Sequence, residues 1–301
     1  MMSSVAARQL RPVRRLLRRV PETSAGAEID AASVLLTEQK AAAVALGDEA
    51  LAKEIWCIES ALDAHRLFRS AFAAICAGEY FEGWCTLEQA EITIGWLRRH
   101  LSDVDTRVFH VEFVAKHVRQ WQELFPYRVF FSTELIEKKI SCGICGARRS
   151  PRSSCGHRVG EIYGGEMCVR RIEEAELLGM AMVSNPVHKY TAARTIKDSD
   201  GTARDHHDYS LVEFVAQRLR SPYHEWSMRK TRRRHPHRNY RAFGPNDKCP
   251  CDSGKKYKRC CLSESGVLGE HVQLSFAEPV PPGLPEYVPP RIAAPRRIRS
   301  T

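Results

Sequence analysis

The sequence predicts a mainly α fold with three parts: an N-terminal helical bundle, a central zinc ribbon with a small β element, and a C-terminal zinc module. Apolar residues recur at helical spacing over the first half of the chain. Most of the 11 cysteines gather in two clusters with metal-ligand spacing, which favours metal binding over disulfides. A chain of 301 residues with 43% hydrophobic residues is also long enough to pack two modest domains.

Residues 1–26 begin with an arginine-rich stretch that contains no acid before residue 22. This composition suits a mitochondrial transit peptide, an anion-binding arm or an extension without a role. We expect a basic disordered arm.

Residues 27–140 show the helical periodicity most clearly, and we expect them to form the bundle. Apolar side chains recur there at steps of three and four residues, as the buried face of a helix requires. The expected helices lie near residues 31–46, 51–75, 84–101 and 111–125.

Residues 141–195 contain the first cysteine cluster and predict a zinc ribbon with a short helix and a strand. Cys142 and Cys145 form a C-x2-C pair with a glycine after each thiol, and such a tight turn points both sulfurs to one side. The second half of the ribbon must supply two more ligands. Beyond it, we expect the helix over 172–178 and the strand over 180–190.

Three donors are available for those two places: Cys155, His157 and Cys168. We expect Cys168 to be the fourth ligand, because GEIYGGEMC reads as a strand and turn that deliver a thiol. The sequence leaves open whether Cys155 or His157 is the third.

Residues 196–242 predict a loop, an amphipathic helix and a basic run. The loop at 197–208 contains Asp-His-His, which is similar to the metal-binding motif of the DHH phosphoesterases, but no apolar strand precedes it. We therefore expect a solvated loop and keep a metal-dependent hydrolase as an alternative.

The basic run holds seven cations interleaved with histidine and tyrosine, a composition typical of surfaces that bind phosphates. These cations are Arg229, Lys230, Arg232, Arg233, Arg234, Arg238 and Arg241.

Residues 243–262 form the second cysteine cluster, in a segment too short to bury a core of its own. The pair Cys249 and Cys251 precedes the adjacent pair Cys260 and Cys261, and a turn at Gly254 would bring the four thiols together. Four thiolates are what a closed tetrahedral zinc site requires. Between the pairs lie four cations that would offset the negative charge of the site: Lys255, Lys256, Lys258 and Arg259.

The run CPCDSGKKYKRCC in this segment resembles the SEC-C motif, a short zinc-binding module found at the C-terminus of the SecA translocation ATPase and as an addition to other bacterial proteins. The resemblance implies that Cys249, Cys251, Cys260 and Cys261 are the zinc ligands. It also implies a protein or ribosomal partner, such as a SecB-like chaperone. Asp252 stands where the family normally has glycine. Nothing else in the chain is similar to the SecA motor.

Residues 263–301 are rich in proline and predict an extended, disordered tail. No apolar run reaches the length of a membrane span, so we expect a cytoplasmic, soluble protein.

The net charge of +10 suggests an anionic partner. Together these features predict a non-catalytic adaptor that holds about two Zn(II) ions and whose basic surface contacts the ribosome, RNA or an acidic protein. A nucleic-acid-binding protein is the other alternative. The expected contacts are Lys255, Lys256, Lys258, Arg259, Arg232, Arg233 and Arg234.

Overall fold

The structure, a computed structural model, describes residues 4–20, 26–153 and 155–281. The chain forms two compact units, Met1–Ala216 and Gln217–Thr301. Helix accounts for 43% of the structure and strand for 24%, and the strands form small antiparallel sheets. The predicted mainly α class is therefore wrong, because much of the chain outside the bundle pairs as long two-stranded sheets.

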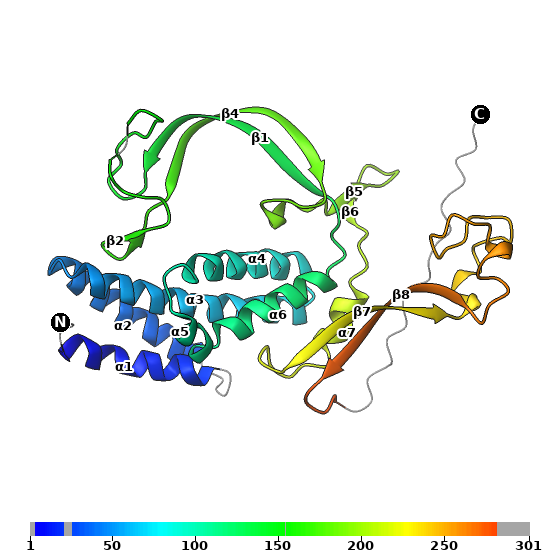
Figure 1. The fold of residues 1–301 in the computed structure, drawn as a ribbon, viewed down its shortest axis with the longest axis horizontal. Coiled ribbons are helices and arrows are strands. Elements are labelled where there is room, and N and C mark those ends of the chain that lie inside the picture. The colour runs from blue at the N-terminus through cyan, green and yellow to red at the C-terminus, as the bar shows by residue number, and fades with distance from the viewer. Residues whose placement is uncertain (1–3, 21–25, 154, 282–301) are drawn as a thin grey trace. The chain divides into compact units, whose positions relative to one another are not determined.

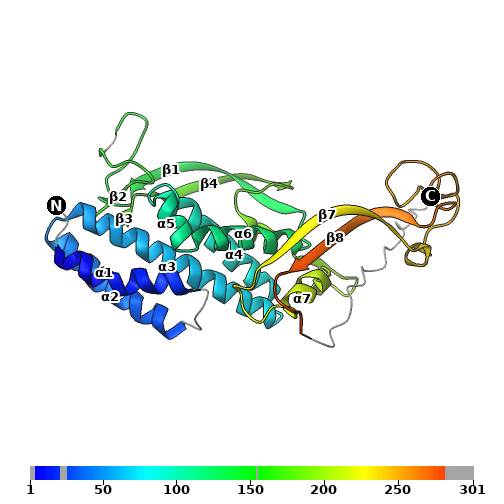
Figure 2. The ribbon, with the colours of Figure 1, turned by 60° about the horizontal axis from the view of Figure 1, so that its bottom comes forward.

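The helices of the first unit pack around α3, which contacts α1, α2, α4, α6 and α7 (Figures 1 and 2). Its side chains Ile55, Leu62 and Phe68 are at most 1% exposed, because apolar residues recur at helical spacing on several faces of this helix. The Asp48 side chain caps its start by accepting a hydrogen bond from the Leu51 amide at 3.0 Å. The helices are α1 Ser4–Arg19, α2 Gly26–Ala45, α3 Glu49–Cys76, α4 Tyr80–Leu97, α5 Asp103–Val108, α6 Val111–Leu124 and α7 Ser210–Ala216.

Helix α1 lies in the segment for which the sequence predicts a disordered arm. Its side chains Leu10, Val13 and Leu17 are at most 2% exposed, and the helix contacts α2 and α3. Burial of this apolar stripe stabilises a helix that its arginine content alone would not. The rest of the predicted arm, at residues 1–3 and 21–25, lies outside the described residues.

Helices α2, α3, α4 and α6 lie where the helical periodicity predicts them. The helical part ends earlier than residue 140, however, because α6 stops at Leu124 and strand β1 (Phe130–Cys142) follows. This strand pairs antiparallel with β4 (Arg170–Val183). The helix expected over 172–178 is therefore part of a strand.

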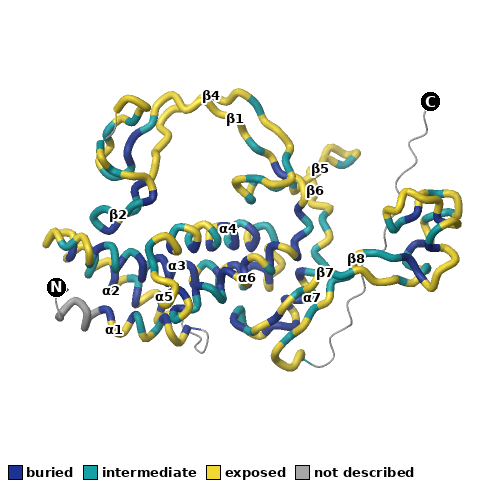
Figure 3. The backbone as a smooth tube through the Cα atoms, viewed as in Figure 1, coloured by how far each residue is buried: buried dark blue, intermediate teal, exposed yellow. Residues whose placement is uncertain are grey.

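The β1–β4 sheet arches over the helices of its unit, and its middle is exposed on both faces (Figures 1 and 3). Charged pairs stabilise it across the strands, among them Lys139 with Glu173 at 2.6 Å and Lys138 with Glu176 at 2.5 Å. A two-stranded sheet that is exposed on both faces needs no alternation of apolar and polar residues. Its sequence therefore lacks the usual strand pattern and is similar to that of an exposed helix.

Both ends of this sheet are anchored on the helices. At one end lies a small hairpin of β2 (Ile162–Tyr163) and β3 (Glu166–Met167), where the Gly164 amide donates to Glu49 at 2.8 Å. At the other end, the Trp84 indole N–H donates to the carbonyl of Lys189 at 2.7 Å, and the buried Glu88 accepts from the Tyr190 amide at 2.7 Å. The neighbouring elements are the 3-10 turn η2 (Lys189–Thr191) and the hairpin of β5 (Thr195–Lys197) and β6 (Ala203–Asp205).

The second unit is built on an antiparallel pair, β7 (Trp226–His235) and β8 (Val267–Phe276), in continuous register from Trp226 opposite Phe276 to His235 opposite Val267. The basic run predicted as a connector or surface is thus largely a strand. Strand β8 lies where the sequence predicts a disordered tail; the tail's residues 282–301 lie outside the described residues. Between the strands come η3 (His237–Tyr240), the cysteine-rich segment and η4 (Tyr257–Arg259).

None of the helices in the described ranges combines the length and the apolar composition that crossing a membrane requires.

Candidate metal centres

The C-terminal cluster, defined as Cys249, Cys251, Cys260 and Cys261, is built on a tight reversal of the chain. The Cys249 amide donates to the carbonyl of Lys255 at 2.7 Å, which closes the loop between them. Asp252 and Gly254 have φ values of 59° and 73°, in the left-handed region that glycine adopts without strain. Asp252 takes this conformation in the position where the SEC-C motif normally has glycine, because aspartate tolerates it better than most residues.

The second pair of thiols follows η4 and meets the first pair. The Sγ atoms of Cys251 and Cys260 are 3.5 Å apart, those of Cys260 and Cys261 are 3.9 Å apart, and all four lie within 4.8 Å of one another. A tetrahedral site with metal–sulfur bonds of about 2.3 Å has edges of about 3.8 Å, so the four thiols fit such an ion. The structure brings together all four residues that the sequence predicts.

A small apolar core supports this cluster. Tyr240, Tyr257 and Val267 are at most 3% exposed and pack with Cys249 and Cys261. His237 fixes the ring of Tyr257, with its Nδ1 atom 2.6 Å from the hydroxyl and its Nε2 atom 2.8 Å from the carbonyl of Glu264. These supporting roles have no signal in the sequence, where Tyr240 and His237 stand out only as parts of the basic run.

The thiols of this cluster differ in acidity. Burial raises the pKa of Cys249 to about 12. Burial also acts against ionisation of Cys251, but hydrogen bonds from Ser253 and Cys249 outweigh it and lower the pKa of Cys251 to about 6. Cys251 is therefore more acidic than Cys249.

The central cluster is defined as Cys142, Cys145, Cys155 and His157, whose ligand atoms also lie within 4.8 Å of one another. The first two residues lie on a knuckle closed by the Gly146 amide, which donates to the carbonyl of Cys142 at 2.9 Å. The backbone N–H of Cys145 donates to the Cys142 sulfur and is the main reason that the pKa of Cys142 falls to about 6. Within the C-x2-C pair, the thiolate is therefore favoured at Cys142, whereas the pKa of Cys145 is raised.

Cys155 and His157 both join this cluster, although the sequence left a choice between them. The His157 Nδ1 atom lies 3.6 Å from the Cys155 sulfur and 3.7 Å from the Cys142 sulfur. Residues two apart rarely point at one place. Here Gly156, with a φ of 85°, turns the chain so that both side chains reach the same point.

Cys168, predicted as the fourth ligand, lies outside this group of four. Its thiol is fully buried, with its sulfur 3.8 Å from that of Cys142, and it receives a hydrogen bond from the Arg149 guanidinium at 3.8 Å. The cluster therefore has three sulfurs and one nitrogen converging, with a further thiol beside it. Arg149 gave no signal in the sequence that tied it to the site.

The cations predicted as partner contacts are exposed: Lys255, Lys256, Lys258, Arg259, Arg232, Arg233 and Arg234. Two of them also serve the fold of the second unit. Arg232 donates to the carbonyl of Cys251 at 3.2 Å, and Arg234 donates to the carbonyl of Gly266 at 2.9 Å and pairs with Glu264.

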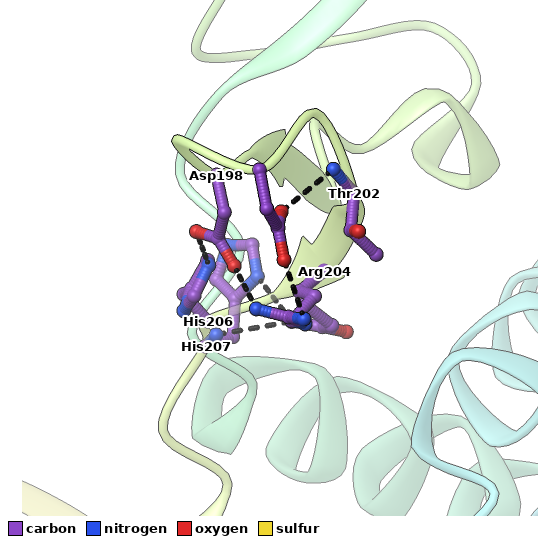
Figure 4. A network of polar contacts seen from close by, with 7 residues as sticks. Asp198, Thr202, Arg204, His206 and His207 are labelled. Atoms are coloured by element: carbon purple, nitrogen blue, oxygen red, sulfur yellow. Dashed lines mark hydrogen bonds and ion pairs between the residues drawn. The ribbon is translucent and has the colours of Figure 1, made fainter.

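The Asp/His loop at 197–208 forms a network of its own, shown in Figure 4. Arg204 binds the carboxylates of Asp198 at 2.7 Å and Asp200 at 2.9 Å, and His206 lies 2.8 Å from Asp198. His207 instead pairs with Asp205 at 2.9 Å. Two carboxylates of the loop, Asp198 and Asp200, are thus held by a guanidinium, whose positive charge opposes binding of a cation there.

Both cysteine clusters can hold a metal ion, and each supplies a full set of four donors. A saturated thiolate site leaves no open position for a substrate or an activated water, so such an ion would act on the fold rather than in catalysis.

Comparison with known proteins agrees with the C-terminal cluster. Residues 246–263 match the family model of the SEC-C motif, a zinc-binding motif. A stretch of 30 residues is 60% identical to the protein translocase subunit SecA of two Clostridium botulinum strains, Eklund 17B and Alaska E43. It covers 10% of this chain and 4% of each SecA, so the chain spans only a small part of these relatives. No solved structure matches the chain. The chain therefore carries a SEC-C motif, and its likeness to SecA is confined to this short stretch.

Proposed function

We propose that the protein is a non-catalytic adaptor that binds two zinc ions and uses its SEC-C module to contact an anionic partner: the ribosome, RNA or an acidic protein. One observation carries this proposal. Residues 217–281 have 14 Lys and Arg against 6 Asp and Glu, a formal charge of +8, whereas residues 1–216 have 28 against 29, a charge of −1. The excess positive charge thus lies in the unit that carries the motif.

The arrangement of ion pairs supports the same division. In the first unit, cations such as Arg98 and Lys139 pair with Glu112 and Glu173. Within the described residues, the four module cations Lys255, Lys256, Lys258 and Arg259 have no ion-pair partner. Exposed cations without internal partners leave a positive potential that steers anions to this surface.

Zinc is the metal we propose for both clusters. Thiolates in a tetrahedral array with one histidine or none are the ligands that structural zinc takes in proteins. When bound, zinc would join the two halves of each cysteine-rich segment. In the C-terminal module, Cys249, Cys251, Cys260 and Cys261 would hold it, and the reduced thiols that it needs suit a cytoplasmic location.

The test is metal content per chain, measured by mass spectrometry on protein purified without added metal, together with identification of what co-purifies at low salt. We expect two zinc ions and an anionic partner that is released as salt rises. Changing Lys255, Lys256, Lys258 and Arg259 to glutamine should release the partner at low salt while both zinc ions stay bound. The matched control removes four paired cations of the first unit: Arg66, Arg98, Lys138 and Lys139. Loss of the partner in both variants would mean that binding depends only on the total charge of the protein, which would contradict the proposal.

A further inference from the structure

The β7–β8 sheet of the second unit has one face without any acidic side chain. Side chains alternate between the faces of a strand, so the register assigns Arg229, Thr231, Arg233 and His235 of β7 to the same face. Opposite them stand four residues of β8, none of which is acidic: Gln273, His271, Gly269 and Val267. The two arginines are four residues apart and therefore about 13 Å from each other along the strand.

The two arginines of this face are available to an external anion. Both are exposed, and neither forms an ion pair with any described residue. Arg234, on the opposite face, is bound instead to Glu264 at 3.1 Å. The pKa of His271 is lowered by burial and then by Arg233 and His235, which agrees with a positive potential on this face.

A groove of about 850 Å³ lies between the sheet and the SEC-C module and includes residues of both faces of the sheet. Thr231 and His235 line it from this face, and Lys230, Arg232 and Glu270 line it from the other. Asn239 of η3 and Asp252 and Pro250 of the module complete it. The hydrogen bond from Arg232 to the carbonyl of Cys251, at 3.2 Å, holds the module against the sheet. The groove therefore belongs to one supported surface in which donors, acceptors and an imidazole face the same space.

From this geometry we infer that the second unit binds a single nucleic-acid strand, with phosphates along Arg229 and Arg233 and one or more bases in the adjoining groove. The inference rests on the proposed function and names its anionic partner. Guanidinium groups bind phosphates through paired hydrogen bonds, and imidazole and guanidinium planes stack on bases.

The groove carries both signs of charge, with Lys230 and Arg232 beside Asp252 and Glu270. Its acids can accept hydrogen bonds from the amino groups of bases, and its cations can bind phosphates, which suits a nucleic acid better than a chain of carboxylates. The face with cations only and the groove with both cations and acids thus suit a polymer that is anionic along its backbone and carries uncharged donors at its side.

The experiment is fluorescence anisotropy with a labelled single-stranded RNA of about 16 nucleotides, titrated with full-length zinc-loaded protein at several salt concentrations. The variant R229Q/R233Q removes the two phosphate contacts. The control K138Q/K139Q removes two cations that pair with Glu176 and Glu173 in the first unit. For wild type, the logarithm of the binding constant should fall with the logarithm of the salt concentration. R229Q/R233Q should reduce that slope by about 1.4, which is about 0.7 for each lost phosphate contact, and the control should leave it unchanged.

Competition arms identify the partner class. Unlabelled RNA and single-stranded DNA of the same length serve as competitors that distinguish the two sources of a phosphate backbone. If either displaces the labelled RNA more strongly than polyglutamate of equal charge does, the inference is supported. Equal displacement by polyglutamate would overturn the inference of a nucleic acid and leave the adaptor proposal intact. The same conclusion would follow if R229Q/R233Q left the slope unchanged while the variant of the four module cations lost the partner. Failure of wild type to bind RNA or DNA at low salt would also overturn it.

Discussion

The sulfur of Cys168 lies 3.8 Å from the sulfur of Cys142, yet Cys168 stands outside the four residues whose ligand atoms converge. Burial raises the pKa of the Cys168 thiol, whereas the pKa of Cys142 is lowered to about 6 by the backbone N–H of Cys145. A protonated Cys168 can donate a weak hydrogen bond to the anionic sulfur of Cys142. We therefore predict that Cys168 supports a ligand rather than binds the metal.

The first prediction follows from this difference. Cys155→Ser and His157→Asn should each lower the metal content from two ions per chain to about one, because a structural site needs all four ligands. Cys168→Ser should keep two ions and bind the central one less tightly. Mass spectrometry of each variant purified in parallel checks this. Full metal content in C155S or H157N, combined with loss in C168S, would show that Cys168 is the ligand that we expected from the sequence.

The cysteine clusters were predictable because metal ligation constrains residue type and spacing. In the C-terminal module, short spacing and Gly254 restrict the loop so strongly that the four thiols can meet in one way. In the central cluster, the choice among Cys155, His157 and Cys168 depends on the φ of 85° at Gly156 and on the anchoring of the β2–β3 hairpin. Both are tertiary features that spacing does not determine.

Helices were predictable where their apolar face is buried, as in α3 and α4, since burial imposes a period. The β1–β4 sheet has mostly exposed residues on both faces, and its segment RRIEEAELLG consists mostly of residues that favour helix over strand. Cross-strand pairing, including Lys139 with Glu173, overrides that preference. Strand β8 did have a signal, the alternation of polar and apolar residues over 271–276, but the proline-rich residues after it obscured the pattern.

Removal of one ligand of the C-terminal cluster should unfold that module without unfolding the bundle. Metal binding in such a short segment provides much of its folding free energy, and the two compact units have separate cores. Cys249→Ser should therefore release one zinc ion per chain and increase hydrogen exchange over residues 243–262. Exchange in α3 should stay at the wild-type level. Unchanged zinc content in C249S would contradict the ligand assignment.

Two glycines of α4, Gly83 and Gly95, allow a matched test of how closely α3 and α4 pack in the bundle. A Cβ atom at Gly83 would lie 2.7 Å from the side chain of Ile75 and 3.3 Å from the carbonyl of Ala71 on α3, whereas a Cβ at Gly95 meets no atom within 4 Å. Gly95→Ala should raise the free energy of unfolding by about 0.5–1 kcal/mol, because alanine favours helix. Gly83→Ala should lose that gain to overpacking and lower the free energy by about 1–3 kcal/mol. Urea unfolding of both variants checks the difference; equal effects would show that α3 and α4 are not closely packed at Gly83.

Acid should destabilise the bundle through His65. This side chain is fully buried, and its Nε2 atom lies 2.8 Å from the carbonyl of Phe109. Burial lowers the pKa of His65 from 6.5 to about 4, although the hydrogen bond to Phe109 acts in the opposite direction. Between these pH values the unfolded chain binds a proton that the folded chain does not, so stability is complete above the unfolded pKa and falls as the pH decreases toward about 4.

The variant His65→Gln separates this effect from other titrations, since glutamine can donate to Phe109 but does not titrate. The free energy of unfolding of wild type relative to H65Q should fall by about 2 kcal/mol between neutral pH and about pH 5. Acid also removes metal from thiolates, but this loss is common to both proteins and cancels in the difference. A difference that stays constant with pH would mean that His65 has the same pKa in the folded and unfolded chains, and a difference that grows as pH falls would mean that folding raises its pKa.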